Sequence, residues 1–512
     1  MTDEWPCFPG PICDSGLVPA TPQLRASRRI GPRELVRLLG PWPAADRPAY
    51  LALAGRVRLL VLDGRLPVGV LLPAERELAA TLGLSRTTVS ATYDALRGSG
   101  HAVSRQGSGT WTALPAADER IPTWAPEPVP EGVLDLVHAA PSAPPQVYAA
   151  FAAALDELPR YLPGTGYDYR GLPGLRARVA ARFTARGLPT TAEQVLITSG
   201  GLQGVRLALA SVVGRGDRVL VEQPSYPNGL DVVRDLGART VPVPMDVGAD
   251  RPARWDAEAV RLAARQTAAR AAYLIPDFQN PTGALMPTAD RQAIAGALAD
   301  AGTLAVVDET LAELALDGDV EVPAPFAVHA RAHTVVTVGS ASKVCWGGLR
   351  TGWLRADAAT VSSLAALRSR QDLAGPVLEQ LACVHLLDRL DEVRAHQVAR
   401  LRDGRATLQR LLAHHLPGWR ASQPAGGQVL WCRLPHPSSS ALATAAAELG
   451  VRVTPGSRFA ADGTLEGWLR LPFTRPAEEL ERAVPLLAQA WARVRPEDVP
   501  AVQEDPVREF VV

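Results

Sequence analysis

The chain has 512 residues, 47% of them hydrophobic, and its 53 basic and 53 acidic side chains give a formal net charge of zero. This length allows two or three domains with ample cores, and the composition is that of an ordinary globular protein. An acidic N-terminus and the lack of any run near roughly 18 apolar residues exclude a signal peptide and a membrane span, and five scattered cysteines indicate a reducing cytoplasm rather than a disulfide framework.

The first 45 residues are rich in proline and glycine and contain one short helical stretch, GPRELVRLLG. We therefore predict an N-terminal extension over residues 1–45. Cys7 and Cys13 are close enough in sequence to form a metal pair, but no further ligands accompany them, so no metal site is expected.

Residues 46–112 have the pattern of a helix-turn-helix followed by a wing. In AYLALAGRVRLLVL the apolar residues recur at helical spacing and predict a first helix. Leu78 and Leu82 share a face of a second helix, and Ser85 is suited to cap a third. The third helix would present its N-terminal residues to base edges and phosphates. HAVSRQGSGTW alternates as a β-hairpin wing would.

Charge alone does not identify this block as a nucleic-acid binder. It holds eight arginines and five carboxylates (8 − 5 = +3), so a helical bundle with solvated basic residues is the alternative. The block nevertheless resembles the winged helix-turn-helix of GntR-type transcription regulators nearly from end to end. This resemblance implies contacts to a double-stranded DNA operator from the second and third helices and the wing: Arg76, Ser85, Arg86, Thr87, Thr88, Gln106 and Gly107.

A composition change separates this block from the rest of the chain. Residues 113–132 carry five prolines in twenty positions, which predicts a semi-extended linker. From 133 to 495, short apolar runs alternate with alanine-rich helical segments, which predicts an α/β domain with a largely parallel sheet. Residues 496–512 are predicted to form a tail.

Several motifs of the α/β region supply groups suited to a phosphorylated aromatic ligand. QVLITSGGLQGVRLAL predicts a strand, a glycine-rich turn and a helix whose free N–H groups form a phosphate cup. Tyr226 offers a flat ring for stacking, and Asn280 offers an amide to a phenolic oxygen. Asp308 follows a buried strand, where open α/β sheets bind ligands, and would pair with a protonated ring nitrogen.

Lys343 is the only lysine of the chain, because 52 of the 53 basic residues are arginine. Arginine replaces lysine in most roles, but it does not lose its proton and attack a carbonyl to form a Schiff base. A chance survivor of the composition bias is the alternative. Ser340 and Arg350 lie three residues before and seven residues after this lysine, and they could add a hydroxyl and a guanidinium to a phosphate site.

Pyridoxal 5′-phosphate (PLP) is the one ligand that asks for all these groups, since it combines an aldehyde, a phosphate, a pyridinium and a phenolate. The order TSGG, PSY, QNPTG, VVDE, SASK and WLRL resembles the fold-type I aminotransferases across about 350 residues. This resemblance implies a Schiff base at Lys343, with Asp308 on the ring nitrogen, Asn280 on the phenolic oxygen and Tyr226 stacked on the ring. It assigns the phosphate to Gly201, Leu202, Ser340 and Arg350, with Tyr167 reaching the neighbouring subunit.

The same resemblance implies that Arg470 clamps the α-carboxylate of a ligand, whereas a structural ion pair is the alternative. Two positions depart from the pattern of the relatives. Thr310 stands where many have a tyrosine, and Leu202 where many have a glutamine. Cofactor binding is expected to survive both changes, while turnover depends on contacts that they remove.

Taken together, residues 33 to 490 resemble the MocR subgroup of GntR-type regulators. The resemblance implies a homodimeric transcription factor whose second domain binds PLP and senses PLP itself or a small amine or amino-acid effector. Two alternatives remain open. One is a working PLP-dependent aminotransferase with a DNA-binding appendage, and the other is a DNA-binding protein whose second domain is only a dimerisation scaffold.

Overall fold

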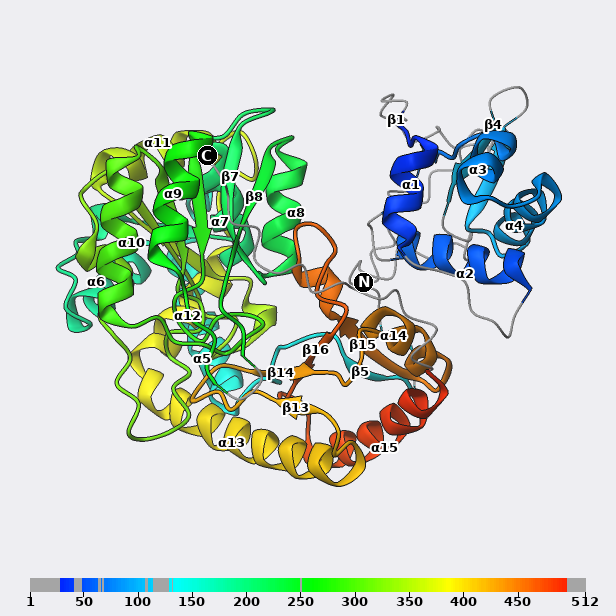
Figure 1. The fold of residues 1–512 in the computed structure, drawn as a ribbon. Coiled ribbons are helices and arrows are strands. Elements are labelled where there is room, and N and C mark those ends of the chain that lie inside the picture. Colours follow the sequence, from blue (N-terminus) through cyan, green and yellow to red (C-terminus); the bar gives the residue numbers. More distant parts are fainter. Residues whose placement is uncertain are drawn as a thin grey trace, which may run out of the picture.

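The computed structural model contains three β-sheets, one in an N-terminal unit and two in the larger C-terminal region (Figure 1). Within the residues that it describes, no helix has the length and apolar character needed to cross a membrane. The described residues are 28–40, 48–62, 66, 69–105, 109–113, 129–130, 132–248 and 251–494.

The N-terminal unit is a winged helix-turn-helix, as predicted. Gly83 adopts the left-handed conformation (φ 69°) between the two helices of the motif, which glycine does at little cost. Ile30, Leu35 and Leu39 are buried in the same core as the three later helices, so residues 28–40 contribute to this unit. Its elements are β1 (Arg28–Arg29), α1 (Pro32–Leu39), α2 (Ala49–Leu62), β2 (Val70–Leu71), α3 (Glu75–Leu82), α4 (Arg86–Gly98), β3 (Ala102–Arg105) and β4 (Gly109–Thr112).

The larger region contains a seven-stranded sheet in the order β6-β12-β11-β10-β9-β7-β8. Only β12 runs antiparallel to its neighbours, which confirms the predicted α/β class with a largely parallel sheet. The strands β6, β9 and β11 are buried along their whole length, as expected for a sheet covered by helices on both sides. The seven strands are β6 (Val195–Thr198), β7 (Arg218–Gln223), β8 (Arg239–Pro244), β9 (Ala271–Leu274), β10 (Leu304–Asp308), β11 (Val335–Ser340) and β12 (Gly352–Arg355).

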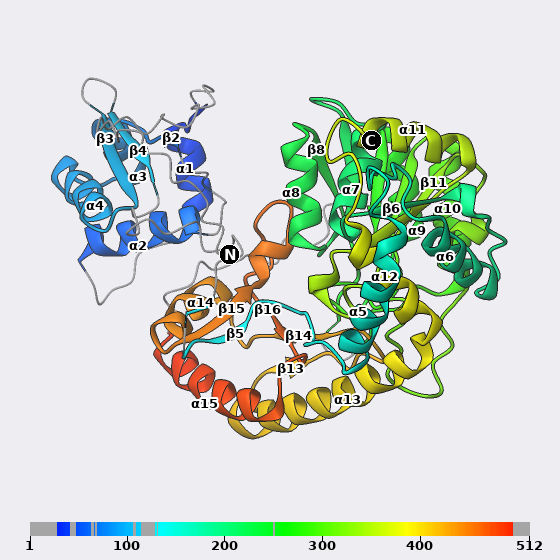
Figure 2. The ribbon, with the colours of Figure 1, turned by 180° about the vertical axis from the view of Figure 1, so that it is seen from behind.

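Helices cover both faces of this sheet (Figures 1 and 2). Residues of α7 (Gly201–Ala210), α8 (Pro227–Asp235) and α11 (Ala358–Arg368) form one buried cluster with the strands. The other face packs against α6 (Pro173–Ala185), α9 (Ala257–Thr267), α10 (Thr288–Asp300) and α12 (Val377–Asp388), and α5 (Gln146–Glu157) lies beside α12.

A five-stranded sheet in the order β13-β14-β16-β15-β5 forms the smaller part of this region. Its strand β5 is the first element after the proline-rich segment and pairs in parallel with β15. The long helix α13 and helices α14 and α15 flank the sheet (Figure 1). The elements are β5 (Leu134–Leu136), α13 (Leu390–His415), β13 (Arg420–Ala421), β14 (Val429–Arg433), α14 (Ser439–Glu448), β15 (Val451–Pro455), β16 (Trp468–Pro472) and α15 (Ala477–Arg493).

Short 3₁₀ turns complete the region at Leu158–Arg160, Ala192–Gln194, Phe326–His329, Gly347–Leu349 and Gly456–Phe459. The adjacent parallel strands β10 and β11 end side by side, with Asp308 opposite Val338 in the register. Groups that follow these strands are therefore brought to the same edge of the large sheet.

Candidate functional site

The N-terminal end of α4 presents a polar, solvent-facing surface. The Ser85 hydroxyl accepts a hydrogen bond from the Thr88 backbone N–H (3.0 Å) and lies 2.7 Å from the Thr87 hydroxyl. This N-cap satisfies a backbone donor that the first helical turn leaves free. Arg76, Arg86 and Thr87 are exposed, while Gln106 and Gly107 lie outside the described residues.

Arg86 is able to reach a ligand, because its side chain is 75% exposed and its contact with Glu75, 3.5 Å from Nε to Oε2, is a long ion pair. Arg97 donates to the hydroxyls of Ser104 and Thr110 at 3.2 and 3.1 Å. This pair of bonds ties the predicted wing to the helix that carries the exposed polar residues.

The turn between β6 and α7 brings a guanidinium to the start of the helix. Gly200 has φ 102°, and a Cβ there would lie 2.6 Å from Nη2 of Arg350. A Cβ on Gly201 would lie 2.9 Å from the Thr310 methyl group. Arg350 donates to the carbonyl of Ser199 at 2.8 Å, so its guanidinium stands at the mouth of the turn. Free N–H groups, a helix dipole and a guanidinium together form a phosphate-type site.

Lys343 lies just after β11, beside the hydroxyl-rich end of that strand. The Ser340 hydroxyl accepts from the Ser342 backbone N–H at 3.1 Å and donates to the Thr351 carbonyl at 3.3 Å. The Lys343 ammonium donates to the carbonyl of Ala139 at 2.9 Å. Burial, together with the positive charge of Arg470, lowers the pKa of Lys343 to about 8, against the opposing effect of Asp308. A lysine in this state supplies a substantial neutral fraction near neutral pH.

Asp308 is only 8% exposed and is held at both oxygens. Oδ2 accepts from the Tyr273 hydroxyl at 2.9 Å and Oδ1 from the Thr310 backbone N–H at 3.0 Å. Tyr226 is the N-cap residue that precedes α8, and burial raises the pKa of its phenol. The carboxylate therefore faces the site in a fixed orientation, with lone pairs left for a further donor.

Arg470 lies on β16 and is 6% exposed. Nη1 donates to Asn280 Oδ1 at 3.4 Å, Nη2 donates to the carbonyl of Val137, and the guanidinium lies 5.0 Å above the Phe459 ring. Burial lowers the pKa of Arg470 to about 10, and its buried Nε has no hydrogen-bond partner. Among the described residues no carboxylate forms an ion pair with it, so the guanidinium is available for a carboxylate from outside.

The structure brings almost all the residues predicted for the α/β region to one place, at the carboxyl edge of the large sheet. Tyr167 is the exception. It lies on a loop and is 59% exposed, and within the described part of the chain it forms no hydrogen bond to the other predicted site residues. Leu202 lies on the first turn of α7. The residues that converge are Gly201, Leu202, Tyr226, Asn280, Asp308, Ser340, Lys343, Arg350 and Arg470.

The sequence interpretation missed four contributors to this site. Tyr273 lies inside a buried apolar strand, where the pattern of a core residue gives no sign of a site, and Ser342 lies next to the lysine without a distinct pattern. The carbonyl acceptors of Val137 and Ala139 could not be found, because backbone carbonyls carry no residue-type signal. Only the Ser-rich SASK motif contained a hint of the second hydroxyl.

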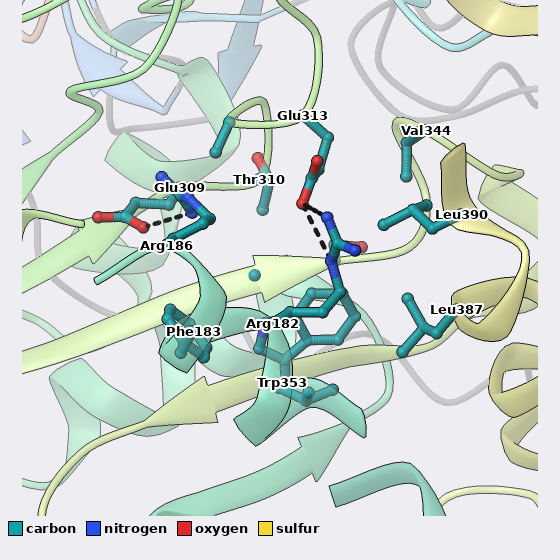
Figure 3. A pocket seen from close by; sticks show the side chains of 14 residues that line it. Arg182, Phe183, Arg186, Glu309, Thr310, Glu313, Val344, Trp353, Leu387 and Leu390 are labelled. Carbon is teal, nitrogen blue, oxygen red and sulfur yellow. Dashed lines mark hydrogen bonds and ion pairs between the residues drawn. The ribbon is translucent and has the colours of Figure 1, made fainter. Parts of the chain in front are cut away.

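A small cavity lies behind Ser340 and Thr310, on the face of the sheet covered by α6 (Figure 3). Ion pairs of Arg182 with Glu313 (2.6 Å) and Arg186 with Glu309 (3.2 Å) line it. Its volume of about 40 Å³ is enough for only a few water molecules. We therefore do not assign a ligand to this cavity.

Two family models match the chain. Residues 49–111 match the bacterial regulatory proteins of the gntR family, and residues 149–487 match aminotransferase class I and II. The first match covers the N-terminal unit, and the second covers about two thirds of the chain, including every residue of the converged site.

Individual relatives agree with both matches. The uncharacterized HTH-type transcriptional regulator YdcR of Escherichia coli is 27% identical over 82% of this chain and 93% of its own length. The probable rhizopine catabolism regulatory protein MocR of Rhizobium meliloti is 29% identical over 48% of this chain and 53% of its own. LysN of Thermus thermophilus, an α-aminoadipate aminotransferase solved with N-(5′-phosphopyridoxyl)-L-leucine, is 29% identical with a TM-score of 0.63, covering 71% of this chain and 93% of that one.

Proposed function

This chain belongs to the aminotransferase class I and II family and is a GntR-type, MocR-like transcriptional regulator, and we propose that it controls DNA binding by capturing PLP on Lys343 and sensing a small amine or amino acid there. The converged site carries this proposal, above all the half-buried Lys343, whose ammonium is held beside Asp308 and Arg470 and whose pKa is lowered. Its N-terminal unit binds DNA, and the chain acts as a homodimer with Tyr167 reaching the partner's phosphate site.

The residues present fit PLP as a bound group. The turn at Gly200 brings the Arg350 guanidinium against the start of α7, and a guanidinium beside helix N–H groups suits a phosphate. Two hydrogen bonds hold the Asp308 carboxylate in a fixed orientation, which suits a ring nitrogen. When bound, PLP supplies an electrophilic aldehyde and a ring that withdraws electrons.

Each residue of the chain then has a definite task. The α7 N-terminus, Ser340 and Arg350 would bind the phosphate, Tyr226 would pack on the ring, and Asn280 would hold the phenolic oxygen. Neutral Lys343 would supply the amine that holds the cofactor covalently, and Arg470 would orient the carboxylate of an amino-acid effector. Burial of the lysine and arginine excludes bulk water from these contacts and strengthens them.

Capture of PLP should depend on pH through the lysine. The ammonium form cannot attack a carbonyl, so the rate at which the apo protein attaches PLP is expected to rise with pH and to level off above the lysine pKa of about 8. Stopped-flow absorbance between pH 6 and 10 measures this rate. A rate that continues to rise in proportion to hydroxide beyond pH 9 would contradict a lysine pKa in this range.

A DNA-binding assay on the promoter region next to the gene tests the regulatory function. We expect a specific shift whose affinity changes with PLP and with one amine or amino acid, by roughly 5- to 150-fold for a typical coupling. Arg86→Ala should weaken the shift about tenfold, since a contact to a base or phosphate is removed. Arg331→Ala, which removes an exposed arginine paired with Asp300, is the matched control. No shift with any neighbouring promoter would refute the proposal.

An active aminotransferase is the second candidate, because Arg470 has no carboxylate partner in the described part of the chain and is suited to a substrate. Incubation with amino acids and 2-oxoglutarate, followed by keto-acid detection, separates the two. Steady keto-acid production would favour the enzyme. Transfer of one amino group per site, after which keto-acid production stops, would favour the sensor.

A further inference from the structure

Tyr273 lies at the base of the converged site, where no role has been assigned to it. It is on β9, opposite Val306 of β10 in the register, and is fully buried. Its hydroxyl donates to Asp308 Oδ2 at 2.9 Å. Burial and the charge of Asp308 raise the pKa of the phenol well above its usual value, so the hydroxyl keeps its proton and acts as a donor.

The surrounding chain makes room for this phenol. Gly229 on α8 faces it, and a Cβ there would lie 2.5 Å from Cε1 and 3.1 Å from the hydroxyl oxygen of Tyr273. Tyr226 and Glu222 are the other titratable groups beside the ring. A buried hydroxyl in a strand of apolar neighbours is costly unless it is paired, and its one partner is the carboxylate predicted to hold the ring nitrogen.

We propose that Tyr273 is a positioning residue that tunes the bound PLP through Asp308, an inference that rests on the proposed function. Its hydrogen bond orients the carboxylate and takes up part of its negative charge. The ring nitrogen then meets a weaker acceptor, which moderates how strongly the ring withdraws electrons. Such moderation suits a site that holds its ligand for sensing.

The test compares Tyr273→Phe with wild type after reconstitution with PLP. We expect Lys343 to attach the cofactor in both, with a shifted pH midpoint in the variant for the colour change of the lysine-bound cofactor, because Asp308 without the phenol is a stronger acceptor. Tyr93→Phe is the matched control, since it removes a buried hydroxyl bonded to the Pro73 carbonyl at 2.7 Å. That change should lower thermal stability without moving the midpoint.

A double-mutant cycle separates a direct effect from loose packing. In an Asp308→Asn background, Tyr273→Phe should no longer shift the midpoint, because the phenol acts through the carboxylate. An unchanged midpoint in the single variant, or an equal shift in both backgrounds, would overturn the role of Tyr273 and leave the proposed function intact. A wild-type protein that attaches no PLP would overturn the proposed function as well.

Discussion

Lys343→Ala is expected to abolish covalent PLP attachment completely while the protein remains folded. No other lysine exists in the chain, so no neighbouring amine can replace it. The side chain contributes one hydrogen bond, to Ala139, and its burial as a charged group is unfavourable, so little stability should be lost. Visible absorbance and intact mass after borohydride reduction measure the attachment.

Lys343→Arg is the informative control for this change. It keeps a positive charge near Asp308 and a donor for the Ala139 carbonyl, but a guanidinium does not form the covalent bond. Both variants should remain colourless and unmodified, with unfolding temperatures close to that of the wild type. A yellow, borohydride-reducible variant would show that the cofactor is held at another group.

Arg470→Ala is expected to weaken binding of amino-acid effectors by roughly 30-fold or more, because loss of one partner of a buried charge pair costs about 2 kcal/mol or more. The guanidinium is 6% exposed and has an unpartnered Nε, so a carboxylate would gain several donors at once. Equilibrium titration of the lysine-bound cofactor spectrum with an amino acid measures the affinity.

The matching amine without a carboxylate serves as the control ligand. It cannot use the guanidinium, so wild type and Arg470→Ala should bind it with similar affinity. If the variant weakens both ligands equally, Arg470 supports the local structure and does not clamp the carboxylate. Arg470→Lys should recover only part of the affinity, since an ammonium lacks the planar pair of donors.

The two-unit organisation could be predicted because local patterns carry it. Helical spacing, the Ser85 cap and the Gly83 turn define the helix-turn-helix without long-range information, and the structure confirms that fold. Short apolar runs between helical segments likewise predicted the parallel sheet. These features depend on residues close in sequence, and such signals survive in a single chain.

The candidate site could be predicted only in part. Lys343 was identified by its uniqueness and Asp308 by its position after a strand. Tyr273 was not identified, because a tyrosine in an apolar strand has the same pattern whether its hydroxyl is structural or functional. Its partner lies 35 positions later, and only the pairing of β9 with β10 brings them together.

By itself, the sequence determined which chemical groups the protein has: one primary amine among its side chains, a strand-end carboxylate, a glycine turn and a capped helix for DNA. The tertiary structure decided how they are held. The Lys343 amine and the Arg470 guanidinium both donate hydrogen bonds to backbone carbonyls of the segment 137–142, which lies about 200 and 330 positions earlier in the chain, respectively. The physical reason is that backbone carbonyls are identical in every residue, so their choice of partner is set by the packing of the two sheets and not by residue type.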